Sequence, residues 1–187
     1  MAVDALSPVS TLCLAILHRG EATGYEIKKE SVEGDYRYFI DASYGSIYPA
    51  LARLAADGLV TQREEQQPGR PARKIYAMTP EGRDALLSAL SEPPGPDVFR
   101  ARFLLVAKFA RELPMEVVAD AVAERKALLA DEIAHLESIA KDETGNAAAQ
   151  WVVEYGRQCL GTSLNHLEKE GDALVALATP SLSEAAE

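Results

Sequence analysis

Two short stretches of the 187-residue sequence hold the side chains best suited to binding an anion. Residues 66–78 carry three cations and no acid, and residues 43–48 combine hydroxyl groups with a glycine. Lysine and arginine bind phosphate, and hydroxyls contact either phosphate or base edges. The chemistry is therefore recognition of a polyanion. The candidates are Ser43, Tyr44, Gly45, Ser46, Tyr48, Arg70, Arg73 and Lys74.

Groups that could make or break bonds are sparse in the sequence. His166 pairs with Glu170 one helical turn later, but no third ligand candidate follows at usable spacing. Cys13 and Cys159 form no CxxC pair, and phosphate-binding glycine loops, GxSxG and HExxH are absent. We therefore expect no metal, no cofactor and no enzymatic activity.

The net charge of −10 is unevenly distributed along the chain. Residues 1–90 hold 10 cations and 12 acids (10 − 12 = −2), whereas residues 91–187 hold 9 and 17 (9 − 17 = −8). A local cationic surface can still bind nucleic acid, because binding depends on where the cations lie. No apolar run approaches the roughly 18 residues of a membrane span. The N-terminus shows no basic segment followed by a long apolar one, so we expect no secretory signal. We expect a cytoplasmic protein with no membrane partner.

The elements needed to position the two stretches follow from capping and turn signals. Three helices are predicted first, then two strands with a long loop between them, then a fourth helix. This order indicates a winged helix-turn-helix over residues 1–90. Because proline fits only the first turn of a helix, the regular part of the third helix is expected to begin nearer Gly45 than Ser43. The predicted helices are 8–19, 23–33, 43–57 and 79–90, and the predicted strands are 59–63 and 73–78.

The second half of the sequence is predicted to be helical, which makes the fold mainly α. Residues 91–97 contain three prolines and a glycine, so they are expected to be a linker. Helices are expected at about 98–110, from Pro114 to Lys141, and from about Ala147 onward. The last helix carries a 4-3-4-3-4 apolar spacing that suits packing against another helix, either in a second copy or in the same chain. Its main members are Leu160, Leu164, Leu167 and Leu174.

In a helix-turn-helix, the start of the second helix of the motif reaches base edges in the major groove. Ser43 and Ser46 either make such contacts or only cap the helix, and Tyr48 either packs in the core or contacts phosphate. Arg53 is either a DNA contact or a solvated surface residue. Since residues 43–48 lack Arg, Asn and Gln, DNA shape is expected to carry more of the specificity than direct base contacts. The cationic loop is either a DNA-contacting wing, with Arg70 near its tip, or a solvated hairpin.

The sequence resembles the PadR family of transcriptional regulators across about 80 residues. The resemblance rests on three strings: Gly24-Tyr25-Glu26-Ile27, the stretch from Gly45 to Val60 beginning GSIYPALxRL, and the stretch from Gly69 to Gly82 beginning GRPARKIY. The C-terminal half resembles, more weakly, the helical domain of the longer members. The resemblance implies a homodimer on a palindromic operator and repression relieved by a small molecule, often a phenolic or other aromatic compound. It adds Tyr25 to the residues expected to touch DNA. Lys28, in the same predicted helix, is also a candidate DNA contact.

The helical half, residues 98–187, is expected to provide dimerisation and an effector site. Trp151 and Tyr155, one turn apart, either line a ligand pocket or pack in a core or interface. A second hypothesis is that the chain is a winged-helix protein-interaction module that does not bind DNA. The absence of arginine at the start of the third helix supports that alternative, whereas the cationic loop argues against it.

Overall fold

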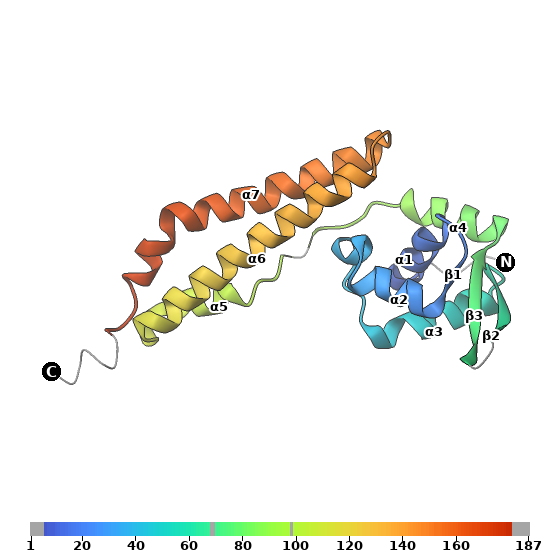
Figure 1. The fold of residues 1–187 in the computed structure, drawn as a ribbon, viewed down its shortest axis with the longest axis horizontal. Coiled ribbons are helices and arrows are strands. Elements are labelled where there is room, and N and C mark those ends of the chain that lie inside the picture. The colour runs from blue at the N-terminus through green and yellow to red at the C-terminus, as the bar shows by residue number, and fades with distance from the viewer. Residues whose placement is uncertain (1–5, 68–69, 98, 181–187) are drawn as a thin grey trace. The chain divides into compact units, whose positions relative to one another are not determined.

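The computed structural model describes residues 6–67, 70–97 and 99–180 (Figure 1). The chain divides into two compact units, Met1–Pro96 and Asp97–Glu187. The fold is mainly helical with one small sheet, as the sequence predicts.

The helices of the N-terminal unit begin where the capping residues predict. Ser7 accepts a hydrogen bond from the Ser10 amide at 3.1 Å at the start of α1, and Thr79 accepts one from the Gly82 amide at 3.0 Å at the start of α4. Thr23 and Glu26 form a complete capping box at the start of α2. The bounds are α1 Pro8–Leu17, α2 Gly24–Val32, η1 Asp35–Tyr38, α3 Tyr44–Ala56 and α4 Pro80–Leu90.

A three-stranded antiparallel sheet completes this unit, in the order β1-β3-β2. Its strands are β1 Ala22–Thr23, β2 Val60–Gln67 and β3 Arg70–Met78. The prediction of a loop over residues 64–72 is wrong, because the ladder continues to the pair Gln67–Arg70 with an irregularity after Glu65. The polar residues of this stretch are held in the strands by cross-strand pairing, which single-residue preferences do not reveal. β1 was not predicted, since two residues carry no periodic signal.

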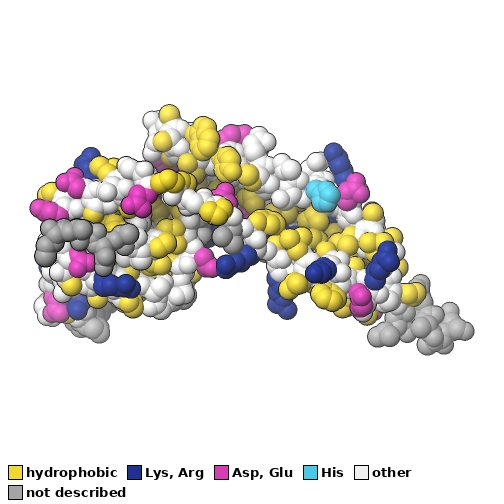
Figure 2. Space-filling model, turned by 180° about the vertical axis from the view of Figure 1, so that it is seen from behind, with side chains coloured by type: hydrophobic (Ala, Val, Ile, Leu, Met, Phe, Trp, Pro, Cys, Tyr) yellow, Lys and Arg dark blue, Asp and Glu magenta, His cyan; other side chains and the backbone are white. Residues whose placement is uncertain are grey.

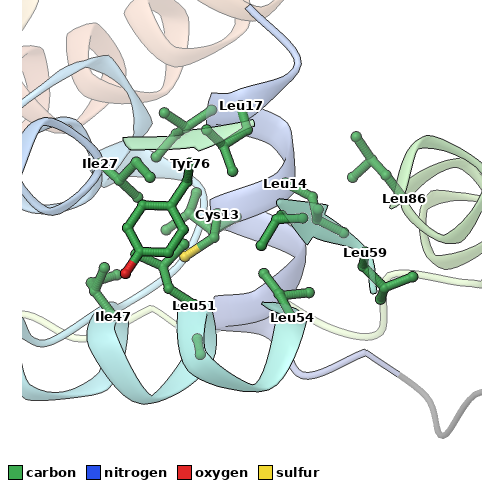
Figure 3. Packing of buried hydrophobic residues seen from close by; sticks show 14 residues of the cluster. Cys13, Leu14, Leu17, Ile27, Ile47, Leu51, Leu54, Leu59, Tyr76 and Leu86 are labelled. Atoms are coloured by element: carbon green, nitrogen blue, oxygen red, sulfur yellow. The ribbon is translucent and has the colours of Figure 1, made fainter. Parts of the chain in front are cut away.

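The core of the N-terminal unit joins α1, α2, α3 and the sheet (Figure 3). Ile47, Leu51 and Leu54, spaced four and three residues apart on α3, are almost fully buried, so this apolar face of the helix points into the core. At the other side of the unit, a Cβ added to Gly82 would lie 2.0 Å from the carbonyl oxygen of Leu59. Only glycine therefore allows the first turn of α4 to lie this close to the backbone of Leu59, the residue that precedes β2.

The C-terminal unit is built on two long helices that pack as an antiparallel hairpin (Figure 1). A Cβ on Gly171 would lie 2.9 Å from Val122, and one on Gly156 would lie 3.1 Å from Leu136, so the small residues allow close packing. The short helix predicted over residues 98–110 is observed only for α5, and residue 98 lies outside the described residues. The bounds are α5 Phe103–Lys108, η2 Ala110–Glu112, α6 Met115–Asp142 and α7 Ala147–Val175.

The heptad-spaced leucines of α7 are covered to different extents by their own chain. Leu167 is buried, whereas Leu160, Leu164 and Leu174 are half-buried. The spacing allows packing against a helix of the same chain or of a second copy, and packing within the chain accounts for Leu167. Dimerisation through these leucines stays a prediction.

Candidate nucleic-acid interface

The first turn of α3 presents polar groups to the outside. Ser43 is the N-cap residue and is exposed, but its side chain makes no capping hydrogen bond. The Ser46 hydroxyl instead donates back to the carbonyl of Ser43 at 2.8 Å. The Ser43 hydroxyl is thus not used to cap the helix, in contrast to the capping threonines of α2 and α4. Tyr44 begins the helix, and its side chain lies outside the described residues.

Gly45, in the same turn, has no packing partner. A Cβ added to it would meet no heavy atom within 4 Å. α3 begins at Tyr44, one residue before Gly45, so Pro49 lies in its second turn. Since proline has no N–H, the carbonyl of Gly45 lacks the helical partner that residue 49 would otherwise supply. The turn therefore exposes backbone as well as hydroxyl groups.

Two exposed tyrosines lie on the helices of the helix-turn-helix motif. Tyr25, in the first turn of α2, is 67% exposed, and Tyr48 is 48% exposed. The ring of Tyr48 covers Gly24, where a Cβ would lie 2.8 Å from Cε1 of the ring. Tyr48 thus packs with one part of its ring and exposes the rest, so both roles considered for it are compatible with its position.

Two further cations lie on the helices of the motif. Lys28 is half-buried on α2, and Arg53 is exposed on α3, two turns beyond the first turn. Lys28 lines a shallow hollow of about 70 Å³ together with Tyr25, Lys29 and Glu33. Both cations are therefore placed where solvent, or a ligand of the helix-turn-helix, can reach them.

The β2–β3 hairpin, called the wing below, distributes its cations between two faces. Arg73 forms an ion pair with Glu65, its cross-strand partner, and its Nε donates to Glu65 Oε2 at 2.5 Å. Lys74 is exposed and lies opposite Glu64 in the ladder. The backbone of Arg70 opens β3, but its side chain lies outside the described residues, so its expected DNA contact stays a prediction.

Sequence reasoning missed the acidic partners of the wing. Arg63 of β2 pairs with Glu21, which precedes β1, and also lies 3.8 Å from a carboxylate oxygen of Glu65. The spacing of Arg63 and Glu65, two residues apart in a strand, places both on one face and was a usable signal. The partnership with Glu21 was not readable, because it depends on the unpredicted strand β1.

The two aromatic residues proposed for a ligand stack on each other on the outside of α7. The rings of Trp151 and Tyr155 are 5.5 Å apart and inclined by 13°. Their exposed fractions are 68% and 56%. A nearby hollow of about 560 Å³, between the end of α6 and the start of α7, is lined by other residues, among them Lys141, Gln150 and Arg157. In the single chain the stacked pair is a surface feature.

The residues that the structure describes contain no cluster of His, Cys, Asp or Glu able to hold a metal ion. Within the same residues, no helix has the length and apolar character required to cross a membrane.

Comparison with known proteins identifies the family. The sequence profile of the "Transcriptional regulator PadR-like family" matches residues 13–88. The chain is 30% identical over 123 residues to the "Negative transcriptional regulator PadR" of Bacillus subtilis, a match that covers 63% of this chain and 67% of that protein. The chain belongs to the PadR-like family. It is thus a member of a family of transcriptional regulators, as the sequence motifs indicate.

Solved structures extend the PadR-like fold to both units. The crystal structure of smu.1604c from Streptococcus mutans matches with a TM-score of 0.76 and 29% identity, covering 86% of this chain and 96% of that one. Bacillus subtilis PadR in complex with operator DNA matches with a TM-score of 0.72 and 21% identity, covering 90% and 99%. A further structure of that protein is in complex with p-coumaric acid. At this identity, the PadR structures show only the fold.

Proposed function

We propose that this PadR-like protein is a DNA-binding repressor that acts as a homodimer and is released from its operator by a small aromatic effector. The first turn of α3 is the observation that carries the DNA-binding part. Gly45 lies in a helix without any neighbour that requires a glycine, although glycine weakens a helix by up to about 1 kcal/mol. Such a residue suits a helix whose backbone must approach another molecule closely.

The chemistry of this turn fits DNA. Amide groups at a helix N-terminus attract phosphate, and the free hydroxyl of Ser43 can contact either phosphate or base edges. Without an arginine, asparagine or glutamine in the turn, the helix reads base edges poorly, so the specificity comes largely from the shape of the groove. Tyr25, Tyr48, Lys28 and Arg53 are proposed to hold the phosphate backbone on either side.

The homodimer is supported by the apolar surface of the C-terminal unit. Leu105 and Phe109 are 60% and 51% exposed, and Leu128 of α6 is 49% exposed. Figure 2 shows hydrophobic side chains over much of the visible face of this unit. A contiguous apolar surface of this kind suits contact with a second copy. Two recognition helices related by a two-fold axis would then bind a palindromic operator.

The effector is proposed from the stacked pair on α7 and from the relative's ligand. Bacillus subtilis PadR has been crystallised with p-coumaric acid, a phenolic acid. Trp151 and Tyr155 offer an exposed aromatic face on which a planar ring can stack. Dimer formation would bring this face into a more enclosed environment, which is where small-molecule sites usually lie.

Binding to a duplex taken from upstream of the protein's own gene tests the proposal, with a scrambled duplex as competitor. We expect Gly45→Ala to weaken operator binding about tenfold, because the added methyl group stands between the helix and the groove. Gly161→Ala is the matched control, since Gly161 of α7 also has no heavy atom within 4 Å of an added Cβ. Fluorescence anisotropy measures both affinities, and the titration is repeated with p-coumaric acid, which should lower operator affinity.

Equal affinities for the upstream and scrambled duplexes would contradict the proposal, as would equal effects of the two alanine variants. Co-purification of a protein partner without DNA binding would instead favour an interaction module. Sedimentation of the wild type and both variants verifies that the oligomeric state is unchanged.

A further inference from the structure

Neighbouring cations of the wing lie on opposite faces of the sheet. Successive residues of a strand point to opposite sides, so Arg73 and Lys74 cannot share a face. The ladder pairs Arg73 with Glu65 and Lys74 with Glu64, which places one acid across from each cation. The two faces nevertheless differ in whether the cation forms an ion pair with the acid across from it.

On the face that carries Arg73, the charges form a connected cluster. Arg73 pairs with Glu65, Glu65 lies 3.8 Å from Arg63, and Arg63 pairs in turn with Glu21. The cluster contains two guanidinium groups and two carboxylates, and its charge is balanced. Arg73 also contributes to lowering the pKa of Glu26, after the larger effect of the Thr23 hydrogen bonds, so a further acid lies within its field. Little net positive charge is left on this face of the wing.

The face that carries Lys74 continues the inner face of the sheet. Tyr76, two residues along β3, is 5% exposed and lies beside Ile47 and Leu51 of α3 in the core (Figure 3). Lys74 is therefore on the α3 side of the wing, beyond the core. Among the residues that the structure describes, Lys74 forms no ion pair, even with Glu64 across the ladder.

We propose that Glu65 holds Arg73 as a positioning residue of the wing, and that Lys74, rather than Arg73, is the cation of this neighbouring pair that neutralises a DNA phosphate. This inference rests on the proposed DNA binding and narrows the wing cations expected to touch DNA. The Glu65–Arg73 pair fixes the two strands to each other across the wing. The pair also limits the affinity for DNA of any sequence. Arg73 held by Glu65 cannot neutralise a DNA phosphate and release the counterion condensed there.

Binding to a duplex of arbitrary sequence, about 30 base pairs long, tests the assignment, since phosphate contacts are independent of sequence. The affinity of the full-length protein is measured against salt concentration for Arg73→Gln and Lys74→Gln. We expect Lys74→Gln to reduce the slope of log K against log salt by about one per bound wing, and the affinity at 0.1 M salt by about five- to tenfold. Arg73→Gln should change the slope by less than half as much.

Glu65→Gln provides the opposite test. It leaves Arg73 without its partner and should raise both the affinity and the steepness of the salt dependence. Adding Arg73→Gln to this variant should then abolish the gain. A purely structural role for the pair would not predict tighter binding by Glu65→Gln, so the sign of this effect separates the two roles. Thermal unfolding of each variant verifies that the wing variants are folded.

An equal loss of slope for Arg73→Gln and Lys74→Gln would overturn the inference, and so would unchanged or weaker binding by Glu65→Gln. These outcomes leave the proposed function intact, because the wild type still binds. If the wild-type protein binds no duplex at low salt, the proposed function fails and this inference fails with it.

Discussion

The two units of the protein stabilise their helices in different ways. In the N-terminal unit, α1, α2 and α4 each begin with a serine or threonine that accepts a backbone hydrogen bond. In the C-terminal unit, α5 and α6 begin without a side-chain cap, and Asn146 caps α7. The N-terminal unit also buries most of its apolar side chains around one core, whereas α5 to α7 leave many exposed. The helix starts of the N-terminal unit are thus set by local capping residues. The exposed apolar side chains of the C-terminal unit suit contact with a partner.

Within the N-terminal unit, α3 is the exception. Ser43 occupies the capping position without capping, and Gly45 occupies a helical position without packing. A local rule broken without an internal reason is typical of a functional surface. The missing cap and the unpacked glycine of α3 therefore mark the candidate interface. Positive charge marks it less clearly, because Arg73 of the wing is neutralised by Glu65.

The largest expected effect concerns the close contact between α4 and Leu59, the residue that precedes β2. Gly82→Ala places a Cβ 2.0 Å from the carbonyl oxygen of Leu59, a backbone atom, so the helix must shift. We expect the free energy of unfolding of the N-terminal unit to fall by about 3 kcal/mol. Six of the seven tyrosines lie before residue 97 and the single tryptophan lies on α7, so the two signals report the two units.

Denaturant titrations followed by tyrosine near-ultraviolet circular dichroism and by Trp151 fluorescence check this prediction. The tyrosine transition should move to lower denaturant, while the tryptophan transition should move much less. Gly45→Ala is the control in the same unit and should not be destabilised, because its methyl group meets no neighbour. Equal shifts of both transitions would show that the two units unfold together. Their stabilities could then not be compared as those of separate units.

The next effect tests whether the apolar surface of α5 is an interface. Leu105→Ser combined with Phe109→Ser removes two exposed apolar side chains and leaves the buried residues of the unit in place. We expect the dissociation constant of the proposed homodimer to rise about a hundredfold, since each large apolar side chain contributes about 1.5 kcal/mol or more when buried at an interface. Analytical ultracentrifugation measures this constant. Tyr25→Ser, which removes an exposed side chain of the N-terminal unit, should leave the dimer unchanged.

The helix starts of the N-terminal unit could be predicted from the sequence. The extent of the wing strands and their ion pairs could not, for a physical reason. Ser7, Thr23 and Thr79 predicted helix starts correctly, because a cap acts on residues three positions away. The extent of the wing strands was missed, since Glu64 to Gln67 are stabilised only by pairing with β3. The neutralisation of Arg73 was missed for the same reason, because it depends on the register of two strands. The hydroxyls and glycine of α3 were identified, but the missing cap at Ser43 and the open space around Gly45 were not.

The smallest expected effect tests the local capping of the N-terminal unit. The pKa of Glu26 is lowered, mainly because its carboxylate accepts hydrogen bonds from the side chain and the backbone N–H of Thr23. A carboxyl group whose pKa falls on folding stabilises the native state above its unfolded pKa. This contribution disappears as the pH decreases through the lowered folded value. Glu26→Gln should therefore cost less than about 1 kcal/mol near pH 7, the usual size of a capping interaction.

The pH dependence distinguishes this origin from a general loss of helix stability. The difference in unfolding free energy between the wild type and Glu26→Gln should shrink as the pH is lowered through the lowered pKa of Glu26, because the wild-type carboxyl then becomes uncharged like the glutamine amide. Glu92→Gln, in the segment between α4 and α5, is the control, because Glu92 lies outside the helices. A difference that stayed constant with pH would mean that Glu26 stabilises α2 without its charge. The charged hydrogen bonds of the capping box would then not be what stabilises the start of α2.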